Sequence, residues 1–225
     1  AVQKPDEVTD LVDFKQPEIS DTDLKAPIYI DFGPTSLSAT PWNNITSHQE
    51  SSTTSWIKDV ENNYTNIGVR VLDGFTATHA GVGSEPASPV TVDGVEFPLT
   101  AWKDGLLVKG EKNQGDVGPG RIEISQLDVA RKYNFTILAI RFNGSKDARI
   151  SSYKLVGKTE SAVKEVKTGI KDAASFAAAN FEEYIAKFEN VEPDSEGKVI
   201  VEVKGLDTGS AAEGHINALC ISLAK

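Results

Sequence analysis

The chain has few of the residues that most often perform chemistry or hold metals. Its 225 residues include one cysteine, Cys220, three histidines and no methionine. A single cysteine excludes an intrachain disulfide framework and a zinc site built from thiolates. The histidines, His48, His79 and His215, also lack a second histidine three to five residues away, which is the usual spacing of zinc ligands. We expect them to be surface or hydrogen-bonded loop residues.

Long apolar runs and excess positive charge are missing as well. No apolar segment approaches the roughly 20 residues that cross a bilayer, so we expect no transmembrane segment. The chain has 23 Lys and Arg against 33 Asp and Glu, a net charge of -10. This charge would repel a phosphate backbone, which argues against nucleic acid as a partner.

Common catalytic motifs are also absent. The sequence contains no Gly-x-Ser-x-Gly elbow, no Gly-Asp-Ser start of flat-sheet esterases and no Walker loop. The glycine-rich stretches 81–84 and 115–120 do not open a helical pattern, so they predict loops and turns and not phosphate cradles. A carboxylate pair for glycoside hydrolysis stays open, because its spacing of roughly 5–10 Å is spatial and not sequential. We therefore expect that the protein is not an enzyme. The catalytic alternative is a carboxylate-dependent glycan hydrolase.

Alternation of apolar and polar residues dominates the chain from residue 26 onward, which is typical of strands with one buried face. About ten or more such segments are separated by Gly, Asn, Asp and Pro, which favours an all-β fold, an antiparallel β-sandwich. One short helix is predicted over 172–179, where an aspartate cap precedes an alanine-rich run. The next run, 183–189, alternates and predicts a strand. Predicted strands cover 28–32, 67–72, 90–92, 95–97, 106–109, 121–124, 135–141, 150–156, 162–166, 198–203 and 216–223.

The first 26 residues differ in composition from the rest. They hold seven acidic residues, three lysines and a single aromatic residue, and such a segment buries too little apolar surface to fold alone. We divide the chain into an acidic arm or linker, 1–26, and one sandwich domain, 27–225. In exported bacterial proteins such an arm often follows a lipid-anchored N-terminus, which predicts an exported, periplasmic or cell-surface protein. The tail of a preceding domain is the alternative.

Two loops contain residues suited to carbohydrate. Trp42, Asn43 and Asn44 follow a proline, and Trp102 lies close to Asp104. An exposed indole can stack on the apolar face of a pyranose while amide and carboxylate groups bond its hydroxyls. The alternative for each tryptophan is a place in the core. A structural calcium held by carboxylates such as Asp31 or Asp73 is a further option, although no EF-hand spacing supports it.

The order of several short segments resembles a known family. These segments are 28–33, 41–44, 71–75, 104–106, 139–141, 148–149, 153–157, 190–193, 197–198 and 214–219. Together they resemble the galactose-binding-like, jelly-roll, carbohydrate-binding-module-like domains of exported proteins from glycan-degrading bacteria, across residues 27–225. The resemblance implies a non-catalytic carbohydrate-binding or enzyme-accessory role. It places Arg141 at a strand end and Asn217 at the entry to the last strand, where either residue orients a loop or bonds a ligand.

Three functions follow from these observations. The first is a non-catalytic glycan-binding protein of the bacterial cell surface or periplasm, taking part in polysaccharide utilisation, with a polysaccharide or oligosaccharide as its partner. The second is a structural or adhesion module that contacts another protein. The third is the carboxylate-dependent hydrolase. The predicted ligand-binding residues are Trp42, Asn43, Asn44, Trp102, Asp104, Arg141 and Asn217.

Overall fold

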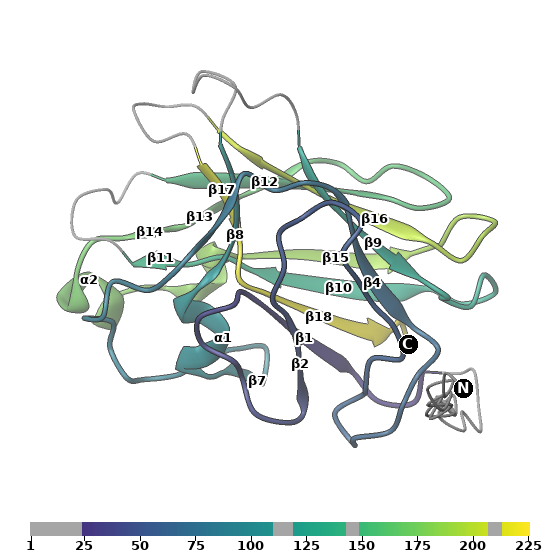
Figure 1. The fold of residues 1–225 in the computed structure, drawn as a ribbon, viewed down its shortest axis with the longest axis horizontal. Helices are drawn as coiled ribbons and strands as arrows, with labels where there is room; N and C mark the ends of the chain where they lie inside the picture. The colour runs from purple at the N-terminus through teal and green to yellow at the C-terminus, as the bar shows by residue number, and fades with distance from the viewer. Residues whose placement is uncertain (1–23, 110–118, 143–148, 207–212) are drawn as a thin grey trace, which may run out of the picture.

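The computed structural model describes residues 24–109, 119–142, 149–206 and 213–225, and it is an all-β sandwich, as the alternation predicts (Figure 1). Its strands are β1 Ile28–Phe32, β2 Trp42–Ile45, β3 Thr53–Thr54, β4 Gly68–Asp73, β5 Ala77–His79, β6 Val90–Val92, β7 Val95–Phe97, β8 Gly105–Lys109, β9 Gly120–Ser125, β10 Tyr133–Leu138, β11 Arg141–Phe142, β12 Ile150–Val156, β13 Lys164–Lys167, β14 Gly169–Ile170, β15 Ile185–Val191, β16 Val199–Gly205, β17 Glu213–Ile216 and β18 Ala218–Leu223. The helices are α1 Leu99–Lys103, α2 Ala173–Ala177 and the 3-10 turn η1 Phe181–Tyr184.

Two large sheets form the sandwich. One has five strands in the order β15-β10-β18-β1-β2, and the other has six in the order β13-β12-β16-β9-β4-β3. Their pairings are antiparallel except for β1 with β2, which run parallel. A three-stranded sheet, β17-β8-β5, stands beside them and contributes Leu106, Val108 and Ile216 to the same core. Two small pairs, β6 with β7 and β11 with β14, complete the described strands.

The main core lies between the large sheets because alternate side chains of each strand point inward. In β9 the buried residues Ile122 and Ile124 alternate with Arg121 and Glu123, which face solvent in part. In β1 the buried inward set is Ile28, Ile30 and Phe32. This period of two, visible in the sequence, therefore identifies the buried face of the strands correctly.

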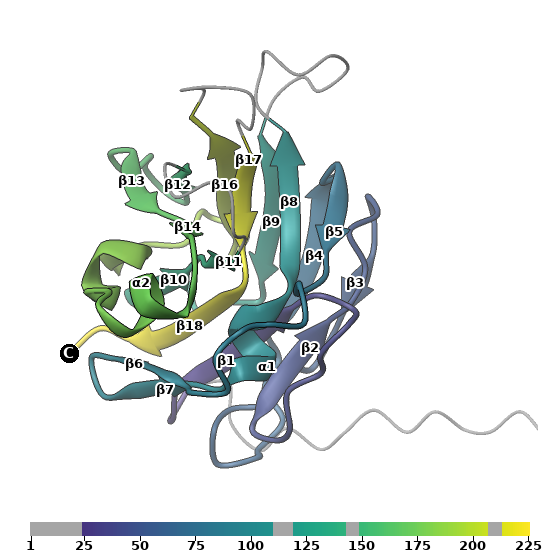
Figure 2. The same ribbon diagram turned by 90° about the vertical axis from the view of Figure 1, so that its left-hand side faces the viewer.

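The five-stranded sheet is buried on its other face as well. A second apolar cluster on that side joins Leu138, Ala218 and Cys220 of the sheet to residues from the β6–β7 hairpin, α1 and α2. In Figure 2 these covering elements lie in the lower half of the view, next to β18 and β1. Burial on both faces explains why the segments 137–140 and 218–221 are continuously apolar and do not alternate.

Several details differ from the sequence prediction. The described residues form two short helices, and the sequence predicted only α2. Both have five residues, but α1 lacks the side-chain cap that Asp172 provides for α2, and it has no alanine-rich run. The segment 42–44, predicted as a loop, belongs to the edge strand β2. Residues 1–23 lie outside the described residues, but Leu24 and Ala26 are buried, and Leu24 belongs to the main core. The folded domain therefore begins before residue 27.

The packing of the second cluster can be tested at Trp102. Its side chain is fully buried and stacks on Phe176, with ring centroids 5.0 Å apart. We expect Trp102→Ala to lower the free energy of unfolding by about 3–5 kcal/mol, because the cavity cannot collapse. Urea unfolding would measure the change, with Val163→Ala at an exposed position as the control. A loss below about 1 kcal/mol would contradict a tightly packed second cluster.

Candidate ligand-binding site

The seven residues predicted from the sequence fall into two groups in the structure. Trp42, Asn43 and Asn44 lie together in β2, at the edge of the five-stranded sheet. In the other group, Asn217 joins Trp102 and Asp104 at the junctions of α1 with β8 and of β17 with β18, and Arg141 follows Ile140, which Asn217 also binds. The sequence did not indicate that these two groups would be separate.

The residues of β2 have structural contacts. The Trp42 ring packs between Tyr29 and Phe97, with centroids 5.1 and 5.7 Å away, and is only partly exposed. The Asn43 amide donates to the carbonyl of Tyr29, at 2.9 Å, and to the carbonyl of Lys58, at 2.8 Å. Asn44 Oδ1 accepts from the amide of Ser38 at 2.8 Å. These amides are therefore occupied in joining β2 to its neighbours.

Trp102 is likewise unavailable as a stacking surface. The indole is fully buried in the second cluster, and Nε1 donates to the carbonyl of Ser88 at 3.3 Å. The expectation of an exposed indole at this position is therefore wrong. The apolar environment provided by Phe97, Phe176 and the strands of the five-stranded sheet outweighed the polar residues that follow Trp102 in the sequence.

Asn217 occupies the centre of the second group and is fully buried. Its Oδ1 accepts from the amide of Ile140 at 2.7 Å, and its Nδ2 donates to the carbonyls of Trp102 and Asp104 at 3.0 and 2.7 Å. One side chain thus joins the end of β10, the end of α1 and the passage from β17 to β18. This positioning role is one of the two that the sequence suggested for Asn217.

Two buried aspartates hold the loop that follows β1. Asp104 Oδ2 accepts from the amides of Thr35 and Ser36 at 2.7 and 3.1 Å, and Asp31 Oδ2 accepts from the amide of Ser38 at 3.0 Å. The Oδ1 atom of each carboxyl is buried without a hydrogen-bond partner. Burial, with a smaller contribution from the charge of Asp104, raises the pKa of Asp31 to about 7.

Metal binding by these carboxylates stays a prediction. Among the residues that the structure describes, no three His, Cys, Asp or Glu side chains gather closely enough to hold a metal ion. Asp73, the other carboxylate proposed for calcium, forms an ion pair with Arg121 on the outer face of the six-stranded sheet.

Arg141 belongs to a group of five ionisable residues that we call the arginine–histidine cluster: His79, Arg141, Arg149, Glu213 and His215. The rings of the two histidines meet edge to face, with centroids 5.0 Å apart. Arg141 Nη1 lies 3.1 Å from His79 Nδ1 and donates to the carbonyl of Ala80 at 2.8 Å. Arg149 Nη2 lies 3.3 Å from Glu213 Oε2, which is itself 3.5 Å from His215 Nε2.

The strands that carry the cluster come from distant parts of the chain (Figure 1). The strands β5 and β17 flank β8, which brings His79 and His215 to the same sheet. Thr168 links the two arginines through the backbone, because its carbonyl accepts from the amide of Arg141 at 2.6 Å and its amide donates to the carbonyl of Arg149 at 2.9 Å. The Tyr153 hydroxyl donates to the carbonyl of His215, which fixes β17 against β12.

Many polar atoms of the cluster have no partner. Arg149 is 7% exposed and His215 is fully buried, yet both side chains keep nitrogen atoms without a hydrogen bond. In the cluster these atoms are Arg141 Nε, Arg149 Nε and Nη1, and His215 Nδ1, and the neighbouring Thr168 Oγ1 is also unpartnered. His215 Nε2 has only the 3.5 Å contact with Glu213 Oε2. Buried donors are normally paired, so an accumulation of free ones at one place is typical of a site that binds a ligand.

The cluster reaches solvent at its rim. Ala80 is exposed, Arg141 is half-buried, and the Glu213 side chain is 23% exposed. Burial, followed by repulsion from the neighbouring charges, lowers the pKa of both histidines, so both rings are neutral at pH 7. The His215 ring, followed by the charge of Arg149, holds the pKa of Glu213 at about 2.

Sequence reasoning identified Arg141 and Asn217 but missed the other members of the cluster. His79 and His215 were expected on the surface or in loops, and the structure instead buries both rings. Arg149 and Glu213 were not singled out. His215 lies between Gly214 and Ile216, at the end of the alternating pattern. This position indicates a strand and was the signal available for His215.

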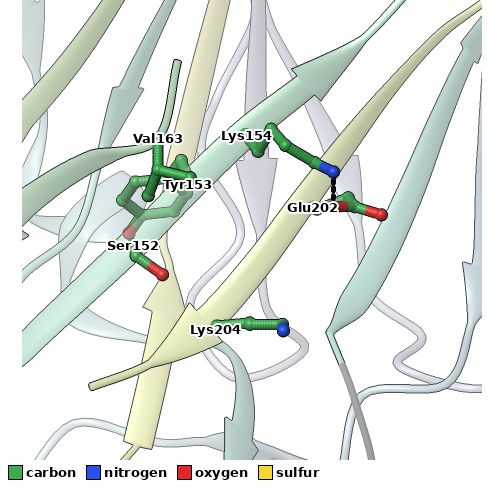
Figure 3. Close-up of a pocket in the computed structure, with 6 residues that line it drawn as sticks. All are labelled: Ser152, Tyr153, Lys154, Val163, Glu202 and Lys204. Atoms are coloured by element: carbon green, nitrogen blue, oxygen red, sulfur yellow. Dashed lines mark ion pairs between the residues drawn. The ribbon is translucent and has the colours of Figure 1, made fainter. Parts of the chain in front are cut away.

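A second candidate is a small hollow on the outer face of β12 and β16, with a volume of about 130 Å³. Figure 3 shows its lining residues, Ser152, Tyr153, Lys154, Val163, Glu202 and Lys204. Lys154 pairs with Glu202, which also binds Arg121, so these side chains are already engaged with one another. The Tyr153 ring is fully buried and offers no stacking surface. The hollow therefore has weaker ligand-binding features than the arginine–histidine cluster.

No protein-family model matches the chain, and no curated protein matches it in sequence. Its fold has similarity to the ANX2 ectodomain from Arabidopsis thaliana, with a TM-score of 0.48 and 9% identity over 88% of this chain and 49% of that chain. The plant receptor-like kinase ANX1 gives a TM-score of 0.44 and 7% identity, over 77% of this chain and 55% of that chain. A truncated AlyQ with CBM32 and alginate lyase domains gives 0.30 and 13%, over 70% and 34%. The chain thus spans about half the length of the ectodomains, and these values assign it to no family.

No described helix is long and apolar enough to span a membrane.

The buried carboxyl of Asp31 predicts a pH dependence of stability. Its pKa is about 7 in the folded protein and about 3.9 when unfolded, so the folded state holds a proton that the unfolded state has lost between these values. The free energy of unfolding should therefore fall as the pH rises from about 4 to about 7, by on the order of 3 kcal/mol. Asp31→Asn should remove this part of the slope.

Urea unfolding at several pH values between 4.5 and 8 would measure the effect. Asp73→Asn is the control, because its carboxylate lies on the outer face, and this variant should keep the wild-type slope. Equal slopes for the wild type and Asp31→Asn would show that Asp31 ionises as freely in the folded protein as in water.

Proposed function

We propose that this protein is a non-catalytic glycan-binding module, and that the arginine–histidine cluster is its binding site. The observation that carries the proposal is the set of buried guanidinium nitrogens of Arg141 and Arg149 that have no hydrogen-bond partner, in a cluster whose rim reaches solvent. A sugar offers several hydroxyl oxygens in fixed directions, and guanidinium donors can bind them.

The cluster is held rigidly, as a binding site requires. Its strands are joined by the Tyr153 hydroxyl, by the backbone of Thr168 and by the hydrogen bonds of the neighbouring Asn217. The resemblance of the sequence to galactose-binding-like, jelly-roll domains supports the same assignment. In this proposal the site lies at the end of β5, β11 and β17 and not at Trp42 and Trp102.

The proposal also includes the location of the protein. We place it outside the cytoplasm, in the periplasm or at the cell surface, where polysaccharides occur. This part rests on the acidic composition of residues 1–26 and on the family resemblance, and fractionation of the native host would test it.

The binding function can be tested by affinity electrophoresis in gels that contain neutral or acidic polysaccharides. We expect at least one polysaccharide to retard the wild type, and Arg141→Gln to lose about 10-fold or more in affinity because it removes donors at the rim of the site. The matched control is Arg121→Gln, which removes the same charge from the outer face of β9 and should bind like the wild type.

Two outcomes would contradict the proposal. If no polysaccharide of the panel retards the wild type, the protein is not a glycan-binding module of this kind. If Arg141→Gln is retarded as strongly as Arg121→Gln, glycans bind elsewhere on the molecule. Circular dichroism of each variant would show that the fold is retained in both cases.

A further inference from the structure

The arginine–histidine cluster contains more positive than negative charge. Arg141 and Arg149 contribute two guanidinium groups, whereas Glu213 is the one member of the cluster with a carboxylate. His79 and His215 are neutral, because burial lowers the pKa of both rings. Burying an unmatched positive charge is unfavourable, so a cluster of this composition is expected to bind an anion.

The other nearby carboxylate does not remove this excess. Glu85 influences Arg141 electrostatically, but its two oxygens already accept the backbone amides of Val82 and Gly83. Among the described residues, no carboxylate lies within ion-pair distance of Arg141. Three guanidinium nitrogens, Arg141 Nε and Arg149 Nε and Nη1, therefore remain without an acceptor.

The guanidinium donors indicate the chemistry of the ligand. Guanidinium groups bind carboxylates through two parallel hydrogen bonds, and such charged bonds are stronger than those to a neutral hydroxyl. The molecule as a whole has a net charge of -10, so a polyanion gains no general attraction to its surface. An acidic ligand would therefore have to be held locally by the arginines.

Resting on the glycan-binding function proposed above, we infer that the glycan is acidic and that Arg141 and Arg149 bind the carboxylate of a uronic acid unit. His215 Nδ1 and Thr168 Oγ1, which are buried without a hydrogen-bond partner, are then the hydrogen-bonding groups for its ring substituents. The carboxylate supplies the negative charge that the cluster lacks.

The test compares uronate polymers with the same polymers after methyl esterification, which removes the charge but keeps the sugar ring and its hydroxyls. Polygalacturonate, alginate and hyaluronan are the probes, and a sulfated galactan distinguishes carboxylate from sulfate recognition. We expect the wild type to bind at least one uronate polymer about 10-fold or more tightly than its ester. It should bind the sulfated galactan no better than the ester.

The variants are compared by the ratio of affinities for the polymer and its ester. Arg121→Gln should keep the wild-type ratio, whereas Arg141→Gln should bring it close to 1. Arg149→Gln should do the same, and because Arg149 is buried, circular dichroism must first show that this variant folds. Arg141 is half-buried, so Arg141→Gln gives an independent measurement if Arg149→Gln does not fold.

Different failures separate this inference from the proposed function. Retention of neutral polysaccharides with an Arg141-dependent affinity, but no preference for uronate over ester, would overturn the acidic ligand and leave the glycan-binding function standing. A preference for the sulfated galactan would also overturn the carboxylate. A uronate preference that survives in both Arg141→Gln and folded Arg149→Gln would place the anion site elsewhere. Retention of no polymer would overturn both proposals.

Discussion

The architecture around the candidate site depends on the hydrogen bonds of one buried side chain, Asn217. It sits between β17, which belongs to the three-stranded sheet, and β18, which is a central strand of the five-stranded sheet. Its amide bonds to Ile140, Trp102 and Asp104 fix three passing chain segments at this point. An apolar residue of similar size would leave buried backbone groups without partners, which is costly in a core. The relative position of the sheets and of the cluster follows from this arrangement.

The arginine–histidine cluster differs from Asn217, whose buried side-chain polar atoms are paired. Here polar atoms are buried without partners, although the rest of the described core satisfies most of its polar groups. Unpaired buried guanidinium donors lower the stability of the folded state. Such groups are expected at one end of the sandwich if that end binds a ligand. The glycan-binding proposal explains these atoms by a ligand that completes their hydrogen bonds. The outer-face ladder of Arg121, Glu202 and Lys154 needs no such explanation, because Asp73 also pairs with Arg121 and Glu160 with Lys154.

The strands could be predicted where one face of a sheet is buried and the other is solvated. Ile122 and Ile124 in β9 illustrate this, since their alternation with charged residues identifies both the strand and its inward face. The edge strand β2 could not be predicted, because its residues are polar and its position is fixed by amide bonds to Tyr29 and Lys58. The helix α1 was also missed, because it has neither the side-chain cap nor the alanine-rich run that indicated α2. The sequence left Trp102 open between a sugar-stacking position and the core, because nothing local indicates the packing partner, Phe176, 74 positions along the chain.

By itself the sequence determined the all-β class, the acidic charge and the lack of a cysteine-based metal site, because these depend on composition and on local periodicity. It also indicated Arg141 and Asn217, which lie next to strand boundaries. Only the tertiary structure decided which polar residues meet. His79, Arg149 and His215 come together because β5 and β17 pair with the same strand β8 and because Thr168 bridges β11 to the start of β12. Pairings between segments this far apart in the chain leave no periodic signal, so the candidate site emerges only when the sheets assemble.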